Sequence, residues 1–504
     1  MRPGGSDRER EGVEAESARS GALLAAGLDL GGSSVKAWVA EVGGSVVAEA
    51  TEAVVTRRPR RHAAELDPVA WWAAARRSLR AAVQGANRPS GEYVGLTASS
   101  LRQGFVLTDG SDELGAGVLN SDRRGATQLD RLRRDVGVDA LYRTTGHWPA
   151  PELTLPKLLH LAEVEPDRWR ATRRVLFVHD WALWRLSGEA VTEASYASAG
   201  QMADVPARRW AADLLDAVGI GTDRLAPLVE AGTAVGRLTD PGLGLPLGLP
   251  VIAGGGDTQL AALGAGGLAD GVVTVVAGST TPVQAATAAP PADPLRHPWV
   301  STHLAADRWA AETNAGYPGT MLAWLAGAAG CDPAMLWDRA AASVPGAAGV
   351  TAVVAAPTWS EEAWATKAPN TVLGVTPATT GDDVARAFVE AHAYAVRANV
   401  ADLERALGAP ARRVVLTGGG ARQPALARLL ADVMGRDVMV PAVAQPAALA
   451  GAAIVARACA LEAATPEPAA AVVAAGDPAP YEEPYRRYLH AHAVLRTHLP
   501  EVDG

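Results

Sequence analysis

An acidic side chain follows the most glycine-rich turn of the sequence. Asp257 stands directly after three glycines in AGGGDTQLAALGAG, and a short apolar run with helical spacing follows it. A carboxylate at the start of a helix is a common N-cap, because its oxygens accept hydrogen bonds from free amides. The same position suits a general base, since the helix dipole favours the charged form of the carboxylate. The local sequence leaves both interpretations open.

A second group of polar residues lies near the start of the chain, in DLGGSSVK. Gly31 and Gly32 let backbone amides approach an anion closely, and Ser33 and Ser34 add hydroxyl donors. Asp29 ends an apolar run and could hold hydrated Mg²⁺, which prefers carboxylate oxygens and keeps several waters. An ordinary tight hairpin turn is the alternative interpretation.

Two further glycine turns extend this pattern. VVAGSTTPV repeats the hydroxyl-rich turn at 278–281, so a phosphate chain held from both sides is predicted, with two ordinary hairpins as the alternative. VVLTGGGARQPALARLLADVMGRDV is typical of a strand, a glycine turn and a helix. It carries neither a GxGxxG fingerprint nor a P-loop lysine. A flat ring could lie against such a turn because no side chain intervenes.

The order of the predicted elements indicates an α/β protein with two lobes. AELDPVAWWAAARRSLRAAV is a predicted helix with Asp67 as N-cap, between segments with strand character. The Gly- and Pro-rich stretch 238–250 is the best candidate for a boundary, and a hairpin with a hydroxyl-rich turn opens each half. We therefore expect a disordered tail at 1–20, an N-terminal lobe at 21–247, a C-terminal lobe at 248–490 and a C-terminal tail at 491–504.

Composition narrows the class of protein further. The 504 residues carry a net charge of −9, without the concentrated basic surface that nucleic-acid binding needs. Cys331 and Cys459 form no metal-binding or disulfide spacing, which fits a reducing cytosol. The first twenty residues lack the apolar core of a secretory signal, and prolines interrupt the uncharged segment 438–456. A cytoplasmic protein without a nucleic-acid or membrane partner is expected.

Six segments, in this order along the chain, resemble motifs of the FGGY carbohydrate kinases. This family is a branch of the actin-like ATPase fold and includes xylulokinase and glycerol kinase. The likeness covers about residues 22–490 and rests on LDLGGSS, LNSDRRG, GGGDTQLAALGAG, AGSTT, TGGGARQPALARLLADVMGRDV and QPAALAGAAIVARA. Each match alone is weak, and the six in this order are specific.

The resemblance implies a fold, cofactors and a site. It implies two actin-like, ribonuclease H-like lobes with a cleft between them, ATP as phosphoryl donor, and Mg²⁺ held by Asp29 through water. The catalytic residue would be Asp257. The phosphate- and ATP-binding residues would be Gly31, Gly32, Ser33, Ser34, Lys36, Gly278, Ser279, Thr280, Gly418, Gly419, Gly420 and Gln423. The residues that bind the small sugar or polyol would be Arg102, Gln103, Asp122, Arg124, Asp257 and Thr258.

The acceptor-binding segments depart from the family pattern. Asn120 stands where the family usually has Trp, and Gln445 stands where many members have Glu. SSLRQGF replaces the Gln-Met-His-Gly of xylulokinases and is nearer the Arg-Glu pair of glycerol kinases. Asp122 and Arg124 have a surface ion pair as their alternative interpretation.

Several functions therefore stay open at this point. A pentulose such as xylulose is the favoured acceptor, and a glycerol- or erythritol-type polyol is an alternative. A pseudokinase that binds sugar or nucleotide without turnover is another, although Asp29 and Asp257 are both present. An activator ATPase of the same fold would bind an iron–sulfur cluster through cysteines, and two distant cysteines argue against it. The sequence leaves the hydroxyl that is phosphorylated undecided, and a homodimer is one possible assembly.

Overall fold

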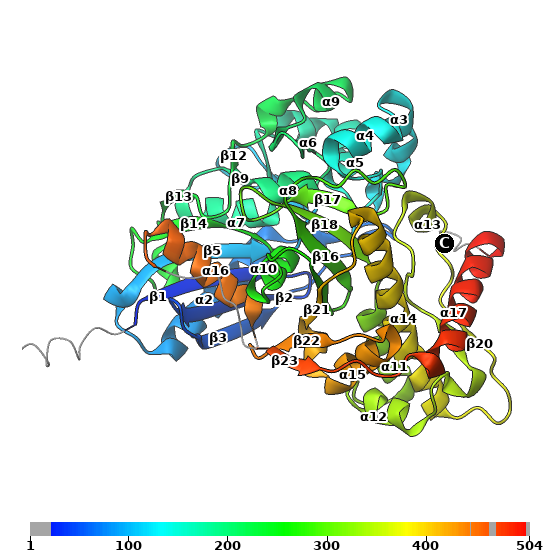
Figure 1. The fold of residues 1–504 in the computed structure, drawn as a ribbon. Coiled ribbons are helices and arrows are strands. Elements are labelled where there is room, and N and C mark those ends of the chain that lie inside the picture. The colour runs from blue at the N-terminus through cyan, green and yellow to red at the C-terminus, as the bar shows by residue number, and fades with distance from the viewer. Residues whose placement is uncertain (1–21, 444, 463–469, 500–504) are drawn as a thin grey trace, which may run out of the picture.

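The computed structural model describes residues 22–443, 445–462 and 470–499. Within these residues the chain forms two lobes, each built on a mixed sheet with helices against it (Figure 1). The predicted tail at 1–20 lies outside the described residues. No helix in these three ranges is long and apolar enough to cross a membrane.

The first lobe contains a six-stranded sheet in the order β13-β14-β5-β1-β2-β3. Its strands are β1 (Leu24–Leu30), β2 (Ser34–Glu41), β3 (Val46–Ala53), β5 (Tyr93–Ser100), β13 (Ala234–Arg237) and β14 (Pro250–Gly256). β1 and β2 form the predicted antiparallel hairpin, β3 pairs antiparallel with β2, and β5 runs parallel to both β1 and β14. The carboxyl ends of β1, β5 and β14 therefore lie at one edge of the sheet.

The second lobe repeats this arrangement in a seven-stranded sheet, in the order β17-β18-β16-β15-β21-β22-β23. Its strands are β15 (Val272–Val276), β16 (Pro282–Thr287), β17 (Trp299–Thr302), β18 (Trp309–Asn314), β21 (Arg413–Thr417), β22 (Val438–Pro441) and β23 (Ala470–Val473). Again an antiparallel meander precedes two parallel neighbours, β21 and β22. Two mixed sheets, each with antiparallel strands beside parallel ones and with helices against it, confirm the predicted two-lobed α/β class.

Two helices of the first lobe, α2 and α8, begin at a residue whose side chain caps them. Asp67 accepts hydrogen bonds from the amides of Val69 and Ala70, and Pro68 is the first helical residue of α2, as predicted. The helices up to the second sheet are α2 (Pro68–Ala86), α3 (Leu129–Asp135), α4 (Val138–Thr145), α5 (Thr154–Val164), α6 (Pro166–Ala171), α7 (Val178–Ser187), α8 (Ala194–Ala199), α9 (Ala212–Ala217) and α10 (Asp257–Gly264).

The second lobe is dominated by one long helix, α14, of 27 residues. A capping box between Thr380 and Asp383 fixes its start, and the left-handed Gly408 ends it. The helices that follow the start of the second sheet are α11 (Pro318–Ala329), α12 (Met335–Ala342), α13 (Glu361–Ala365), α14 (Gly381–Leu407), α15 (Pro424–Met434), α16 (Pro446–Ala458) and α17 (Ala479–His498).

Short strands complete the structure. A four-stranded sheet, β4-β7-β6-β8, extends the first lobe and carries helices α3 to α6 with it (Figure 1). The short strands are β4 (Glu65–Leu66), β6 (Phe105–Thr108), β7 (Gly117–Val118), β8 (Arg174–Phe177), β9 (Thr192–Glu193), β10 (Ala203–Asp204), β11 (Arg209–Trp210), β12 (Leu228–Val229), β19 (Thr351–Val353) and β20 (Thr371–Leu373).

The predicted boundary at 247/248 does not coincide with the edge of the first sheet. The stretch 238–250 connects β13 to β14, which are antiparallel neighbours in one sheet, so its Gly and Pro residues form a turn within a lobe. Strand β14 therefore belongs to the first lobe, and α16 also packs there, against α10 and β5. At the other end, α17 continues to His498, so residues 491–498 of the predicted tail are helical.

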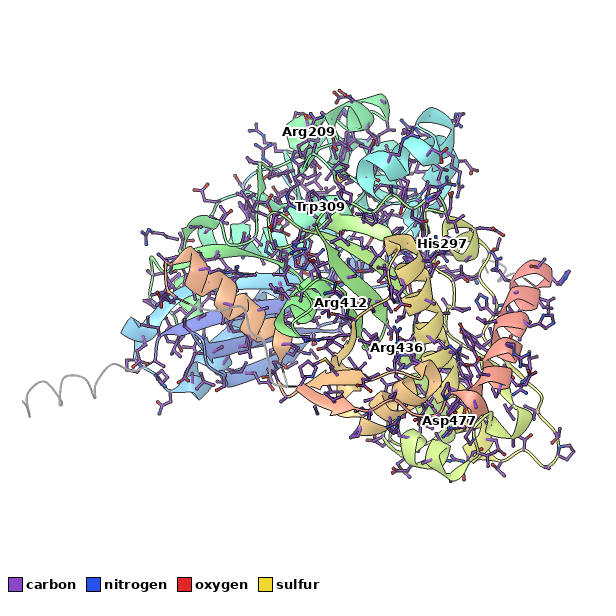
Figure 2. All side chains as sticks on the ribbon, viewed as in Figure 1. Arg209, His297, Trp309, Arg412, Arg436 and Asp477 are labelled. Atoms are coloured by element: carbon purple, nitrogen blue, oxygen red, sulfur yellow. The ribbon has the colours of Figure 1, made fainter. Side chains whose placement is uncertain are left out.

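The lobes contact each other through β18. The indole N–H of Trp309, labelled in Figure 2, donates a hydrogen bond to the Val205 carbonyl at 3.0 Å. The guanidinium of Arg208 lies 5.8 Å from the centre of the same ring and donates to the Arg308 carbonyl at 3.0 Å. These contacts tie the edge of the second sheet to the segment 205–208 of the first lobe.

The close contact between α10 and α16 predicts a stability defect. A Cβ atom on Gly264 would lie 1.8 Å from the Pro446 carbonyl oxygen, so Gly264→Ala must push the two helices apart. We expect it to lower the free energy of unfolding by about 1–3 kcal/mol, which thermal unfolding measures. Gly327→Ala is the matched control, since a Cβ there meets nothing within 4 Å. Equal unfolding midpoints for the two variants would contradict this packing.

Candidate functional site

Asp257 is the first residue of α10 and follows directly on β14. The N-cap residue is Gly256, and no side chain caps this helix. Oδ1 of Asp257 accepts hydrogen bonds from the amide and the hydroxyl of Thr258, at 2.6 and 3.1 Å. The carboxylate is therefore not the N-cap of α10.

The glycines before Asp257 stand where side chains would collide with their neighbours. A Cβ atom on Gly254 would lie 2.0 Å from the backbone oxygen of Ala98, and one on Gly256 would lie 3.1 Å from Cδ of Arg102. Neither glycine has a positive φ. The triplet therefore serves close packing of the backbone that leads to the carboxylate.

Two charged groups act on Asp257 from neighbouring strand ends. Burial and the negative charge of Asp29 raise the pKa of Asp257 to about 6, while Arg102 and the hydrogen bonds from Thr258 oppose that rise. A carboxylate with such a pKa is ionised at neutral pH and still basic enough to accept a proton. The three side chains Asp29, Arg102 and Asp257 thus form one electrostatically coupled group.

Asp29 is the sixth residue of β1 and lies opposite Lys36 of β2. The Ser99 hydroxyl donates a hydrogen bond to Oδ1 of Asp29 at 3.0 Å. Burial raises the pKa of Asp29, and the Ser99 hydrogen bond and the charge of Lys36 lower it. Oδ2 makes no hydrogen bond to any described residue, so one oxygen of this carboxylate is available to a ligand.

The predicted phosphate-binding residues lie in three turns. Gly31 donates to the Ser34 carbonyl at 3.0 Å, Gly278 donates to the Thr280 carbonyl at 2.9 Å, and Gly420 donates to the Ala277 carbonyl at 2.8 Å. The last bond joins the second turn to the third, at the ends of β15 and β21. Within these turns lie Gly32, Ser33, Ser279, Gly418 and Gly419, while Ser34 and Lys36 belong to β2 and Gln423 precedes α15.

A cavity of about 280 Å³ adjoins Asp29 and opens between the lobes. Its walls include Lys36 and Ser99 from the first lobe and the glycine turn after β21 from the second. Of the predicted ATP-binding residues, Lys36, Gly418 and Gly419 line it, and those of the turn at 278–280 do not. Sequence patterns did not single out other lining residues: Trp38, Glu49, Thr97, Leu260, Arg422 and Ala448.

Arg102 pairs across the lobes with Glu312 of β18, with Nη2 2.9 Å from Oε1. The two side chains are only 10% and 6% exposed, so water screens this pair weakly. The other oxygen of Glu312 accepts a hydrogen bond from the Gln284 amide, its register partner on β16. The pair therefore links the strand end next to Asp257 to the second sheet.

Gln103 adopts a left-handed backbone conformation with φ 62°. Its carbonyl accepts hydrogen bonds from the Thr154 hydroxyl at 3.1 Å and from Nζ of Lys157 at 3.2 Å. Lys157 is fully buried, donates also to the Leu119 carbonyl at 2.8 Å, and has its pKa lowered by burial to about 7. The strained turn at Gln103 is thus fixed by helix α5.

Asp122 and Arg124 form a buried ion pair, which contradicts the alternative interpretation as a surface pair. Asp122 is fully buried, and its oxygens accept from the Ala64 amide at 2.7 Å and from the Arg124 guanidinium at 2.9 Å on each side. Arg124 also donates to Glu65 at 2.7 Å. These contacts stabilise the small sheet of the first lobe. The contacts of this pair lie within the first lobe.

Three residues of this region were not predicted as site residues from the sequence: Glu312, Tyr196 and Lys157. Glu312 is the one charged residue of the strand WAAETN, which is a usable signal, whereas nothing local distinguishes the other two. No cluster of three or more His, Cys, Asp or Glu side chains suited to a metal occurs among the described residues. A divalent cation at this site would need most of its ligands from a phosphate chain and water.

Family models, curated relatives and solved structures that are similar to this chain point to the same kind of protein, a carbohydrate kinase. Models of the N- and C-terminal domains of the FGGY family of carbohydrate kinases match residues 24–264 and 273–460. The autoinducer-2 kinase of Yersinia enterocolitica is 30% identical over 404 residues, which cover 76% of each chain. The xylulose kinase structure from Rhodospirillum rubrum has a TM-score of 0.80 and 26% identity, covering 94% of this chain and 99% of that one. Plasmodium falciparum glycerol kinase with ADP has a TM-score of 0.81, 14% identity, and coverage of 95% and 99%.

The raised pKa of Asp257 predicts that its charge destabilises the fold. Its folded pKa of about 6 exceeds its unfolded value, so the stability it contributes is present below about pH 4 and is lost as the pH rises through 6. At pH 8 we expect Asp257→Asn to raise the free energy of unfolding by about 1–3 kcal/mol. Thermal unfolding of this variant and of the exposed control Asp216→Asn measures the difference. An Asp257→Asn protein less stable than the parent at pH 8 would refute it.

Proposed function

Because the chain belongs to the FGGY family of carbohydrate kinases, phosphotransferases with an alcohol group as acceptor, we propose that it uses ATP to phosphorylate a small ketose or polyol. A pentulose such as xylulose is the favoured acceptor. One observation carries the proposal: a partly buried carboxylate, Asp257, has a pKa raised to about 6 where the two lobes meet. Asp29, beside the interlobe cavity, acts electrostatically on it.

In the proposed reaction Asp257 is the general base. The acceptor hydroxyl has a pKa far above 7, so its proton must leave as its oxygen attacks the γ-phosphorus. The new oxygen–phosphorus bond forms as the bond to the bridging β,γ-oxygen breaks, ADP departs, and the proton passes to the Asp257 carboxylate. The Arg102–Glu312 pair closes the adjacent strand end against the second lobe, which supports exclusion of water from the transfer.

The phosphate chain of ATP is assigned to the two hydroxyl-rich turns, whose residues lie outside the cavity lining while Lys36 lies within it. Backbone amides and hydroxyls at 31–34 and 278–280 can donate to phosphate oxygens, and Lys36 adds a positive charge. Gly418 and Gly419 line the cavity without side chains, which favours the adenosine there. The turn at 278–280 lies outside the cavity lining, so its role requires the lobes to close further.

Asp29 fits the proposed Mg²⁺ site. Ser99 holds one oxygen of its carboxylate and the other makes no hydrogen bond among the described residues. Mg²⁺ is commonly bound through one or two carboxylates together with phosphate oxygens and water. When bound, the ion supplies positive charge to the β- and γ-phosphates. Asp29, held through Ser99, keeps its free oxygen directed to that side of the cavity.

The acceptor is proposed from two lines of support. Xylulose kinases are among the similar structures, and the Arg102-Gln103 segment keeps the glycerol- or erythritol-type polyol as an alternative. The curated relatives at 30% identity are autoinducer-2 kinases, which makes autoinducer-2 a second candidate. The buried Asp122–Arg124 pair supports the lobe and needs no acceptor contact.

Acceptor-dependent ADP release tests the proposed function. We expect ADP to form with Mg²⁺-ATP and one of xylulose, ribulose, erythritol, glycerol or autoinducer-2. Asp257→Asn should reduce kcat by about 10²–10⁴-fold because the proton acceptor is lost. Binding of ADP, measured by calorimetry, should persist in this variant. No acceptor-dependent ADP across the panel would favour the pseudokinase, and full activity of Asp257→Asn would remove its role as base.

The pH dependence of kcat/KM provides an independent prediction. Only ionised Asp257 accepts a proton, so kcat/KM should rise with pH through about 6 and level off above it. Asp29→Asn removes a negative neighbour and should move this acid limb to lower pH, besides weakening the dependence on Mg²⁺. Asp216→Asn should leave the limb in place. An acid limb that Asp29→Asn does not move would contradict the electrostatic coupling.

A further inference from the structure

The strand that leads to Asp257 loses its register with its neighbour. β14 pairs in parallel with β5, with Ile252 opposite Thr97, and the register shifts between Ile252 and Gly255. Such a bulge bends the strand and leaves ladder groups without their usual partners. Because it lies within five residues of Asp257, whatever satisfies these groups also sets the direction of the carboxylate.

Two side chains from helices of the first lobe replace the missing ladder bonds. Nε2 of His179, on α7, accepts a hydrogen bond from the Gly254 amide at 3.1 Å. The hydroxyl of Tyr196, on α8, lies 3.0 Å from the Gly255 carbonyl oxygen, to which it donates. Both side chains are 0% exposed. The bulge is therefore held by an imidazole and a phenol from outside the sheet.

The Tyr196 hydroxyl also binds the neighbouring strand end. It accepts a hydrogen bond from the Ser100 amide at 2.9 Å, the last residue of β5. Ser100 precedes Arg102 by two residues, and Gly255 precedes Asp257 by two residues. One hydroxyl thus fixes the separation of the two strand ends that carry the charged groups of the site.

The imidazole of His179 is locked in one tautomer and one orientation. Because Nε2 accepts from an amide, the ring proton is on Nδ1, which donates to Oδ1 of Asp180 at 2.8 Å. The ring is stacked on Tyr196, with centroids 4.7 Å apart and planes inclined by 12°. Glu193 completes the network, since its amide donates to Asp180 and its carboxylate caps α8.

This network is costly for stability. Asp180 and Glu193 are fully buried, and Oδ2 of Asp180 and Oε1 of Glu193 accept no hydrogen bond from the described residues. Burial raises the pKa of Glu193 to about 8 and raises that of Asp180 as well. An apolar filling of the same space would generally be no less stable. Its geometry, rather than its stability, explains a polar network at this place.

We propose that His179 and Tyr196 are positioning residues that aim the Asp257 carboxylate at the acceptor by holding the bulge of β14. The inference rests on the proposed role of Asp257 as base. Neither side chain touches a reacting atom, since both act through the backbone of Gly254 and Gly255. Their loss lets the bulge relax, and a small displacement of a reacting group is enough to slow a transfer strongly.

Tyr196→Phe tests the inference with the ring kept and the hydroxyl removed. We expect kcat to fall roughly 10- to 100-fold while KM for ATP stays unchanged. Tyr488→Phe is the matched control, because that equally buried hydroxyl donates to the Ala355 carbonyl at 2.7 Å, in the second lobe. It should lower the unfolding midpoint by a similar amount and leave kcat intact. Equal kcat values for the two variants would overturn the inference.

A second pair of variants tests His179 by rescue. The amide oxygen of glutamine reaches the place of Nε2 and can accept from Gly254, so His179→Gln should retain more of the parental kcat than His179→Leu. Equal losses in both would overturn the role of the acceptor atom. This comparison is made at matched folded fractions, from the far-ultraviolet circular dichroism of each protein.

A double variant separates this inference from the proposed function. In an Asp257→Asn background Tyr196→Phe should cause no further loss of the residual rate, since it acts through Asp257. Full additivity would overturn the inference. A single Asp257→Asn variant with parental turnover would instead refute the proposed base. An inactive Asp257→Asn combined with a fully active Tyr196→Phe would leave the base in place and remove the positioning role.

Discussion

Three parallel strands of the first sheet end at the same edge. This brings the partly buried carboxylates of Asp29 and Asp257 close enough to interact electrostatically. β1 ends beside Asp29, β14 leads into Asp257, and β5 runs between them. Burial, and after it the negative charge of Asp29, raise the pKa of Asp257 to about 6. Two neighbours stabilise these carboxylates. Arg102 offsets part of the negative charge, and the Ser99 hydroxyl donates a hydrogen bond to Asp29.

The second lobe contributes by covering that edge. Glu312 of β18 pairs with Arg102 in a nearly buried contact, and the glycine turn after β21 forms one wall of the cavity beside Asp29. Low exposure strengthens each of these interactions, because water screens them weakly. The two lobes are therefore coupled through the same charged group that the proposed chemistry uses, so closure and reactivity share one set of contacts.

Local patterns predicted much of this molecule. The hydroxyl-rich turns, the capped helix α2 and the position of Asp257 after a glycine turn follow from short-range propensities that tertiary structure did not override. The boundary near 247 was wrong in detail because Gly and Pro mark a hairpin as readily as a linker, and only strand pairing distinguishes them. Glu312, His179 and Tyr196 each have a partner distant in sequence: Arg102, the Gly254 amide and the Gly255 carbonyl, respectively. No local signal encodes such contacts.

The proposed chemistry depends on the ionisation state of the Asp257 carboxyl group. The pKa of Asp257 can be measured directly by nuclear magnetic resonance, from the pH dependence of the aspartate side-chain carbon signals of the folded protein. The Asp257→Asn variant assigns the signal. We predict a titration near pH 6 for Asp257 that moves to lower pH in Asp29→Asn. A value near 4 in the parent protein, unchanged by Asp29→Asn, would contradict the coupling of the two carboxylates on which the site is built.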